Sequence, residues 1–334
     1  MSECGTSPWI EEQTKTLLAQ RGHAWLLTGP SGLGQYSLAL ALARAWLCER
    51  PGALGACGAC ASCHSVDVRT HADLCVLMPE AVMQTLGWPL SEAAQSDLDD
   101  KKRKPSKEIR VEAMRDAVEF AQRTSARGRG KVILVYPAER MNVVSANTLL
   151  KTLEEPAGEL RFVLASEAAH QLLPTIRSRC QSHTMLWPST EVALTWLRSQ
   201  GVDEAQADMV LRAAGGRPQD ALQFFLSEQE VQVWQSLPNA IVAGNVGIFK
   251  EWSAFQVLSA LQKLCHDMMA LNAGTQPRFF EAVALPVKRP SMAVLTAWAR
   301  ALRDSQRTVE HPFNPGLMLE ALVSQAQNAL NSAP

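Results

Sequence analysis

The chain has 334 residues, which is too long for one ordinary hydrophobic core and predicts two or three domains. Hydrophobic residues make up 47% and charged residues 19%, as in a soluble globular protein, and a formal net charge of −1 excludes a generally basic nucleic-acid coat. No apolar run reaches the roughly 18 residues that span a bilayer. Residues 1–4 lack the blocks of a signal peptide, so a cytoplasmic protein without membrane contact is expected.

The first half of the chain alternates apolar runs with helical patterns. Residues 24–29 predict a buried strand that ends in glycine, and a Gly-rich turn leads into a helix from about 37 to 46. Further strands are predicted at 74–78, 131–135 and 161–166. Further helices are predicted from about 109 to 121 and from 142 to 153. Residues 80–107 lack a clear period and predict a long surface loop. This alternation indicates an α/β domain with a parallel sheet covered on both faces.

After residue 188 the strand signal fades and helical periodicity takes over. Residues 190–228 predict a small helical unit, and the pattern from about 230 to 330 is helical throughout. Three domains are therefore predicted: an α/β domain at 1–187, a small helical domain at 188–229 and an all-helical domain at 230–334.

The turn after the first strand has the spacing of a phosphate loop without its chemistry. The loop runs from Gly29 through Gly34, between a strand and a helix, where backbone amides can hold phosphates. An active loop continues with a lysine that neutralises phosphate charge and a hydroxyl that holds magnesium. Gln35 and Tyr36 stand in these two places.

The other half of a nucleotide site is also missing. The strand at 131–135 runs into Tyr136 and Pro137, where an active site has acidic residues that hold magnesium, and no carboxylate follows until Glu139. Both losses remove charge-stabilising groups. We therefore expect neither productive ATP binding nor hydrolysis. A strand–helix turn without nucleotide ancestry and a live ATPase are the alternatives.

Four of the eight cysteines are clustered. They are Cys48, Cys57, Cys60 and Cys63. Two Cys-x-x-Cys steps and a fourth thiolate suit tetrahedral Zn²⁺, and four soft protein ligands leave no open position, which predicts a structural site at 48–63. A redox Cys-x-x-Cys, or a ligand replaced by His64 or His71, is the alternative. The remaining cysteines are interpreted as packing residues: Cys4, Cys75, Cys180 and Cys265.

These motifs, in this order, resemble the clamp-loader subunits of bacterial DNA polymerase III, most closely the delta-prime type. The resemblance covers almost the whole chain and is carried by residues 146–156 (Ala-Asn-Thr-Leu-Leu-Lys-Thr-Leu-Glu-Glu-Pro), 162–166 (Phe-Val-Leu-Ala-Ser) and 173–180 (Leu-Pro-Thr-Ile-Arg-Ser-Arg-Cys). Gamma/tau subunits have similar segments with intact nucleotide motifs, whereas the delta-prime type has a degenerate phosphate loop. The resemblance implies an AAA+ P-loop domain with a zinc module, a helical lid and a helical collar.

The resemblance also implies a residue that acts on another subunit's ATP. In clamp loaders the arginine of the Ser-Arg-Cys motif, here Arg179, points to the γ-phosphate of the next subunit's ATP as an arginine finger. Arg177 is the less favoured finger, and an ordinary surface ion pair of Arg179 is the alternative. The nucleotide-sensing arginine of active relatives is Gln219 here, with Arg217 close by as a substitute.

The implied partners are the gamma/tau and delta subunits in a hetero-pentamer, primer–template DNA within the complex and, indirectly, the sliding clamp. The expected function is that of a non-hydrolysing subunit that helps load the clamp in DNA replication. An ATP-hydrolysing gamma/tau-type subunit and a zinc-dependent DNA-binding module are the alternatives. DNA polymerase activity would belong to the complex, because no residue here performs polymerisation. Two basic clusters are weak candidates for DNA contact: residues 101–104, and Arg123, Arg127, Arg129 and Lys131.

Overall fold

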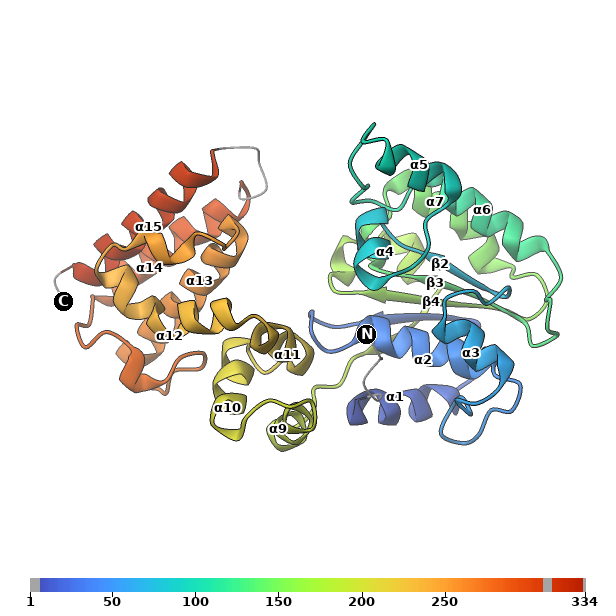
Figure 1. The fold of residues 1–334 in the computed structure, drawn as a ribbon, viewed down its shortest axis with the longest axis horizontal. Coiled ribbons are helices and arrows are strands. Elements are labelled where there is room, and N and C mark those ends of the chain that lie inside the picture. Colours follow the sequence, from blue (N-terminus) through green and yellow to red (C-terminus); the bar gives the residue numbers. More distant parts are fainter. Residues whose placement is uncertain (1–6, 309–313, 333–334) are drawn as a thin grey trace. The chain divides into compact units, whose positions relative to one another are not determined.

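The computed structural model describes residues 7–308 and 314–332 (Figure 1). It divides into two compact units, Met1–Pro188 and Ser189–Pro334. No helix among the described residues has both the length and the apolar character needed to cross a membrane. The further division of the second unit near residue 229 stays a prediction.

The first unit is built on a five-stranded parallel sheet in the order β2-β3-β4-β1-β5. The strands are β1 (Ala24–Thr28), β2 (Leu74–Leu77), β3 (Lys131–Val135), β4 (Leu160–Ser166) and β5 (Gln181–Thr184). The predicted parallel sheet is confirmed, but β5 was not among the predicted strands. This edge strand, Gln-Ser-His-Thr, is largely exposed and so has no apolar run to reveal it.

Helices cover both faces of this sheet: in Figure 1, α1 to α3 lie on one face and α6 and α7 on the other. The helices of the first unit are α1 (Pro8–Leu18), α2 (Gln35–Leu47), α3 (Ala61–Asp67), α4 (Glu80–Leu86), α5 (Glu92–Asp99), α6 (Val111–Gln122), α7 (Val143–Glu154) and α8 (Pro174–Arg177), with 3₁₀ turns η1 (Ala138–Arg140) and η2 (Ala169–Gln171). Because both faces are covered, β3 is buried along its whole length.

Helix α7 is held firmly at both ends and along one face. The Asn142 side chain caps its first turn by accepting a hydrogen bond from Ser145 N at 2.9 Å. Leu149 and Leu153 lie in the apolar cluster beneath the sheet and are fully buried. The helix ends at Glu154, before Pro156, which cannot continue a helix. Its C-terminal residue is therefore carried on a rigid element.

The prediction of a long loop at 80–107 was wrong, because this segment contains α4 and α5. Helix α5 buries no residue, so it has no apolar stripe to reveal it, and its start depends on a cap in which Ser91 Oγ accepts from Ala94 N at 3.3 Å. The segment is tied down by the buried Glu80, which accepts from Arg103 Nη2 at 2.8 Å and from Ser106 N at 2.8 Å. Burial opposes ionisation of Glu80, but the Arg103 hydrogen bonds outweigh it and lower the pKa of this carboxyl.

The second unit is helical throughout its described residues. Its helices are α9 (Thr190–Ser199), α10 (Glu204–Ala213), α11 (Pro218–Leu226), α12 (Glu228–Val242), α13 (Ala254–Asn272), α14 (Met292–Gln306) and α15 (Pro315–Asn331), with 3₁₀ turns η3 (Val246–Phe249) and η4 (Ala282–Ala284). One apolar cluster joins α12 to α15 and also takes in Ala213 and Phe224 from α10 and α11. At its centre the rings of Trp234 and Phe280 stack at 4.2 Å.

Asp73 fastens a turn of the first unit to the start of β2. Its carboxylate is 1% exposed and accepts hydrogen bonds from Ser125 Oγ at 3.1 Å, Ala126 N at 2.7 Å and Arg127 N at 2.9 Å. Hydrogen bonds to an ionised acceptor contribute more to stability than bonds between neutral groups.

We expect Asp73→Ala to lower the free energy of unfolding of the first unit by about 3 kcal/mol, because it removes three hydrogen bonds to a buried carboxylate and releases the turn. Urea denaturation followed by far-ultraviolet circular dichroism measures this change. Asp67, whose ion pair with Arg44 is partly exposed, is the control, and Asp67→Ala should cost less than about 1 kcal/mol. Equal losses for the two variants would contradict the role of Asp73.

Candidate functional site

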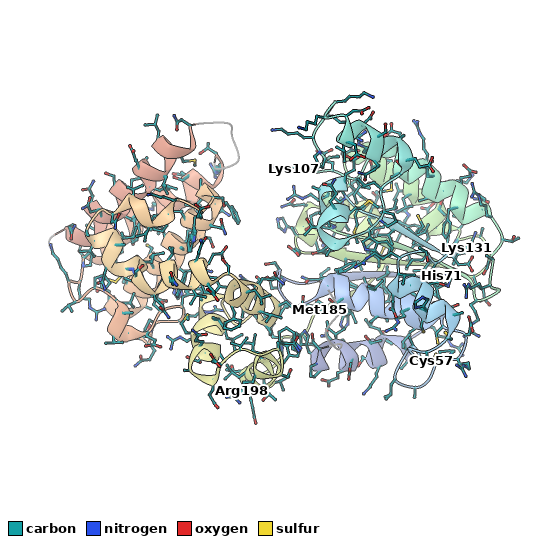
Figure 2. All side chains as sticks on the ribbon, viewed as in Figure 1. Cys57, His71, Lys107, Lys131, Met185 and Arg198 are labelled. Carbon is teal, nitrogen blue, oxygen red and sulfur yellow. The ribbon has the colours of Figure 1, made fainter. Side chains whose placement is uncertain are left out.

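The loop predicted as a phosphate loop lies between β1 and α2 and is a tight turn that requires glycine. Gly32 and Gly34 have φ angles of +75° and +93°, and Gly34 is the N-cap of α2. Glycine adopts this left-handed region at little cost, whereas other residues are strained there. A Cβ on Gly29 would lie only 2.9 Å from the Cβ of Met185, which Figure 2 labels. The turn is thus intact, although the residues after it differ from those of an active loop.

The side chain of Gln35 is buried and forms hydrogen bonds with the backbone of this loop. It is 2% exposed, and its Nε2 donates hydrogen bonds to the carbonyl oxygens of Gly29 and Pro30, both at 2.6 Å. A lysine at this position would bring a positive charge to the phosphates, but the amide is neutral. The amide satisfies the loop's own carbonyls instead, so the loop is stable without a ligand.

The chain's two tyrosines meet at the place where an active relative holds magnesium. The rings of Tyr36 and Tyr136 lie 5.5 Å apart between centroids, at 32° to one another. Trp88 Nε1 donates to Tyr36 Oη at 2.7 Å, and Tyr136 Oη donates to Glu167 Oε1 at 2.9 Å. Both predicted defects of the nucleotide site therefore form one aromatic pair that hydrogen bonds hold in place. Sequence reasoning missed Trp88, because it lies in the segment taken for a loop.

We expect the isolated chain to bind Mg·ATP no more tightly than a Kd of about 1 mM, because the loop lacks both cation and metal ligands and the amide fills it. Isothermal titration calorimetry measures the affinity, with a gamma/tau-type subunit as the positive control. Magnesium-dependent binding in the micromolar range would show that the loop still functions and would favour the ATPase alternative.

Four cysteine thiols form the one group of clustered metal-ligand side chains found among the described residues. Their Sγ atoms all lie within 4.8 Å of one another, and Cys48, Cys60 and Cys63 are buried while Cys57 is exposed. The cysteines are free, and the 3.8 Å between the Cys48 and Cys60 sulfurs is far beyond a disulfide bond. The spacing of the sequence therefore brings these four side chains together as predicted, and they could hold a metal ion.

The surroundings of these thiols shift their pKa values in opposite directions. Burial opposes ionisation of Cys60, but the backbone N–H of Cys63 and its neighbours outweigh it and lower the pKa of Cys60 to about 6. Burial and the neighbouring Cys60 thiol raise the pKa of Cys63 to about 12. Four thiolates so close together repel one another, and a bound cation removes this repulsion.

The two histidines considered as replacement ligands lie outside the four-cysteine group. His71 Nδ1 accepts a hydrogen bond from Asp73 N at 3.0 Å, so this ring nitrogen faces the start of β2. Figure 2 shows His71 and Cys57 at separate positions of the first unit. The donor set is therefore four sulfurs.

Arg179 follows α8, and its guanidinium lies against the end of α7. Its Nε donates to Glu154 Oε1 at 2.5 Å and its Nη2 to the same oxygen, while Nη1 donates to Thr175 O at 2.8 Å. The Arg179 side chain keeps 31% of its surface exposed. Arg177 is also exposed, and in the part of the chain that the structure describes its guanidinium has no hydrogen bond or ion pair. The surface ion pair considered for Arg179 is thus present.

The basic clusters are largely engaged within the chain. Arg123 pairs with Glu119 at 2.5 Å and Arg127 with Glu49 at 3.2 Å. Lys131 is buried, and its Nζ donates to the last carbonyl groups of α6, where a cation stabilises a helix end. In the first cluster Arg103 pairs with Glu80, as described above. In the second unit Arg217 pairs with Asp220 at 2.6 Å. These cations therefore have structural partners.

Comparison with known proteins shows the family. The profile of the family described as DNA polymerase III, delta subunit, matches residues 10–186. The DNA polymerase III subunit delta′ of Pseudomonas aeruginosa is 33% identical over 95% of this chain and 96% of its own length. The chain belongs to the delta-prime subunit family of bacterial DNA polymerase III. The predicted resemblance, and with it the AAA+ α/β domain followed by a helical region, is confirmed.

Other proteins are also similar to this chain. The subunit delta′ of Escherichia coli is 34% identical over 69% of this chain and 62% of its own length. The gamma/tau subunit of Mycobacterium bovis is 32% identical, but over only 60% of this chain and 32% of its own length. A gamma subunit-related protein of Thermotoga maritima with a solved structure is 15% identical, covers 96% of this chain and has a TM-score of 0.46. Of the sequence relatives named here, the delta′ subunit of Pseudomonas aeruginosa is the one that is similar along nearly the whole chain.

Proposed function

We propose that this delta-prime family member works as a non-hydrolysing subunit of a clamp loader and supplies Arg179 to the ATP of an adjacent subunit. Its partners would be gamma/tau and delta subunits in a hetero-pentamer, together with primer–template DNA and, indirectly, the sliding clamp. A cytoplasmic location and no polymerase activity of its own are part of this proposal. The observation that carries it is the Gln35 amide, which closes the chain's own phosphate loop.

The chemistry of phosphoryl transfer supports a division of labour between subunits. The transition state spreads negative charge over the oxygens of the transferred group, and cations stabilise it. This chain has lost the loop cation but carries, at Arg179, a guanidinium that is always charged and partly exposed. Because this chain is not expected to bind ATP itself, the Arg179 guanidinium can act on the ATP of a neighbouring subunit.

In a loader reconstituted with all its subunits, we expect Arg179→Ala to reduce DNA-stimulated ATP turnover without dissolving the complex. Arginine fingers contribute on the order of 10³–10⁵ in rate at the site they serve, so the turnover of that one site should be lost. Phosphate release measures turnover, and size-exclusion chromatography measures assembly.

Arg177→Ala is the matched control, because Arg177 lies two residues earlier and is exposed without a partner among the described residues. It should leave turnover unchanged. Unchanged turnover in the Arg179→Ala complex would remove the finger role, and a loss confined to Arg177→Ala would transfer it to that residue.

The metal held by the four cysteines is proposed to be Zn²⁺ in a structural role. Zn–S bonds of about 2.3 Å in a tetrahedron put neighbouring sulfurs about 3.8 Å apart. The Cys48–Cys60 and Cys57–Cys63 sulfurs are 3.8 and 4.0 Å apart, which fits this ion. Zn²⁺ has no redox chemistry, and four protein ligands leave no position for water or substrate. The ion would join α3 to the end of α2.

We expect the purified chain to contain a single zinc ion, and Cys60→Ser to lose it, because a hydroxyl does not replace a thiolate on zinc. Inductively coupled plasma mass spectrometry measures the metal content, and the melting temperature of the first unit should fall when the metal is lost. Cys265→Ser, a change at a buried cysteine of the second unit, should retain the metal. Full zinc content in the Cys60→Ser protein would contradict the four-sulfur site.

A further inference from the structure

The contacts of Arg179 use some of its hydrogen-bond donors and leave others available. A guanidinium has five N–H groups: one on Nε and two on each Nη. Glu154 Oε1 accepts from Nε and from Nη2, and Thr175 O accepts from Nη1. Among the described contacts, one N–H therefore remains on Nη1 and one on Nη2. The two Nη atoms form the outer end of the group, the part of a guanidinium that can donate to two phosphate oxygens at once.

The two acceptors hold the guanidinium from the protein side. Glu154 is the last residue of α7, whose Leu153 is fully buried, and Thr175 lies in α8 beside the fully buried Ile176. These helices also pack against one another. The acceptors are thus carried on packed elements, so they fix both the position and the plane of the guanidinium.

Fixing a long side chain in advance matters for catalysis in trans. A free arginine has many rotamers, and ordering it at the moment of reaction costs conformational entropy. A small misplacement of a catalytic group can cost a factor on the order of 10² in rate. A carboxylate that holds the inner edge of the guanidinium avoids both losses.

We propose that Glu154 is a positioning residue that holds Arg179 by its inner edge and presents the outer two N–H groups to the γ-phosphate of the neighbour's ATP. This inference rests on the proposed finger role of Arg179. It assigns to Glu154 no contact with the nucleotide and no proton transfer.

The experiment compares three variants in the reconstituted loader: Arg179→Ala, Glu154→Gln and Glu155→Gln. The loss of turnover with Arg179→Ala defines the full contribution of the finger. Glu154→Gln should remove most of that contribution through kcat, with the KM for ATP nearly unchanged, because the neighbour's own loop binds the nucleotide. Glu155 is the next residue, is exposed, and among the described residues forms no hydrogen bond or ion pair with Arg179, so Glu155→Gln should leave turnover unchanged.

A double variant separates positioning from a general structural effect. In the Arg179→Ala background, Glu154→Gln should cause no further loss, because its effect passes through the missing guanidinium. Glu154→Asp, which keeps the charge on a shorter side chain, should recover part of the turnover that Glu154→Gln loses. The ion pair is partly exposed, so these variants should fold, and melting temperature and assembly are checked in parallel.

Three results would overturn the inference. Unchanged turnover with Glu154→Gln, while Arg179→Ala reduces it, would remove Glu154 and leave the finger in place. Higher turnover with Glu154→Gln would mean that the carboxylate competes with the phosphate and holds the finger back. Additive losses in the double variant would mean that Glu154 acts elsewhere. If Arg179→Ala itself had no effect, the proposed function would fail first.

Discussion

The hydrogen bonds from the Gln35 amide to the carbonyl oxygens of Gly29 and Pro30 decide what this chain can do. An active phosphate loop has a lysine at this position, but here a neutral amide donates to two carbonyl oxygens of the same loop. The aromatic pair of Tyr36 and Tyr136 completes the change on the magnesium side. Both contacts are made within the chain, without a nucleotide.

Helix α7 links the core of the first unit to Arg179 at its surface. Helix α7 packs its apolar side into the core and ends at Glu154, where its last carboxylate meets Arg179. The helix thus connects the packed interior to an arginine at the surface. The proposed role of Arg179 on a neighbour's ATP depends on this connection. The four-cysteine module is independent of this arrangement, since it lies between α2 and α3.

Sequence patterns identified the buried parts of the fold because burial leaves a period in the sequence. Strands β1 to β4 are apolar runs, and α7 carries a stripe of leucine and alanine, so both were predicted. Strand β5 and helix α5 were missed for the opposite reason: one is an exposed edge strand and the other buries no residue, so neither bears an apolar signal. Trp88 was missed with them, although it holds Tyr36 in the degenerate site.

From the sequence alone came everything that depends on residue identity at fixed local spacing: the missing lysine and hydroxyl at Gln35 and Tyr36, and the four clustered cysteines. Such sites can be predicted from the sequence because their residues are close along the chain, so a turn or a short helix brings them together without help from the rest of the fold. Only the tertiary structure decided that Tyr36 meets Tyr136 and that Arg179 meets Glu154. These partners are far apart in the sequence, and it is the order of strands in the parallel sheet that sets which loops and helix ends become neighbours.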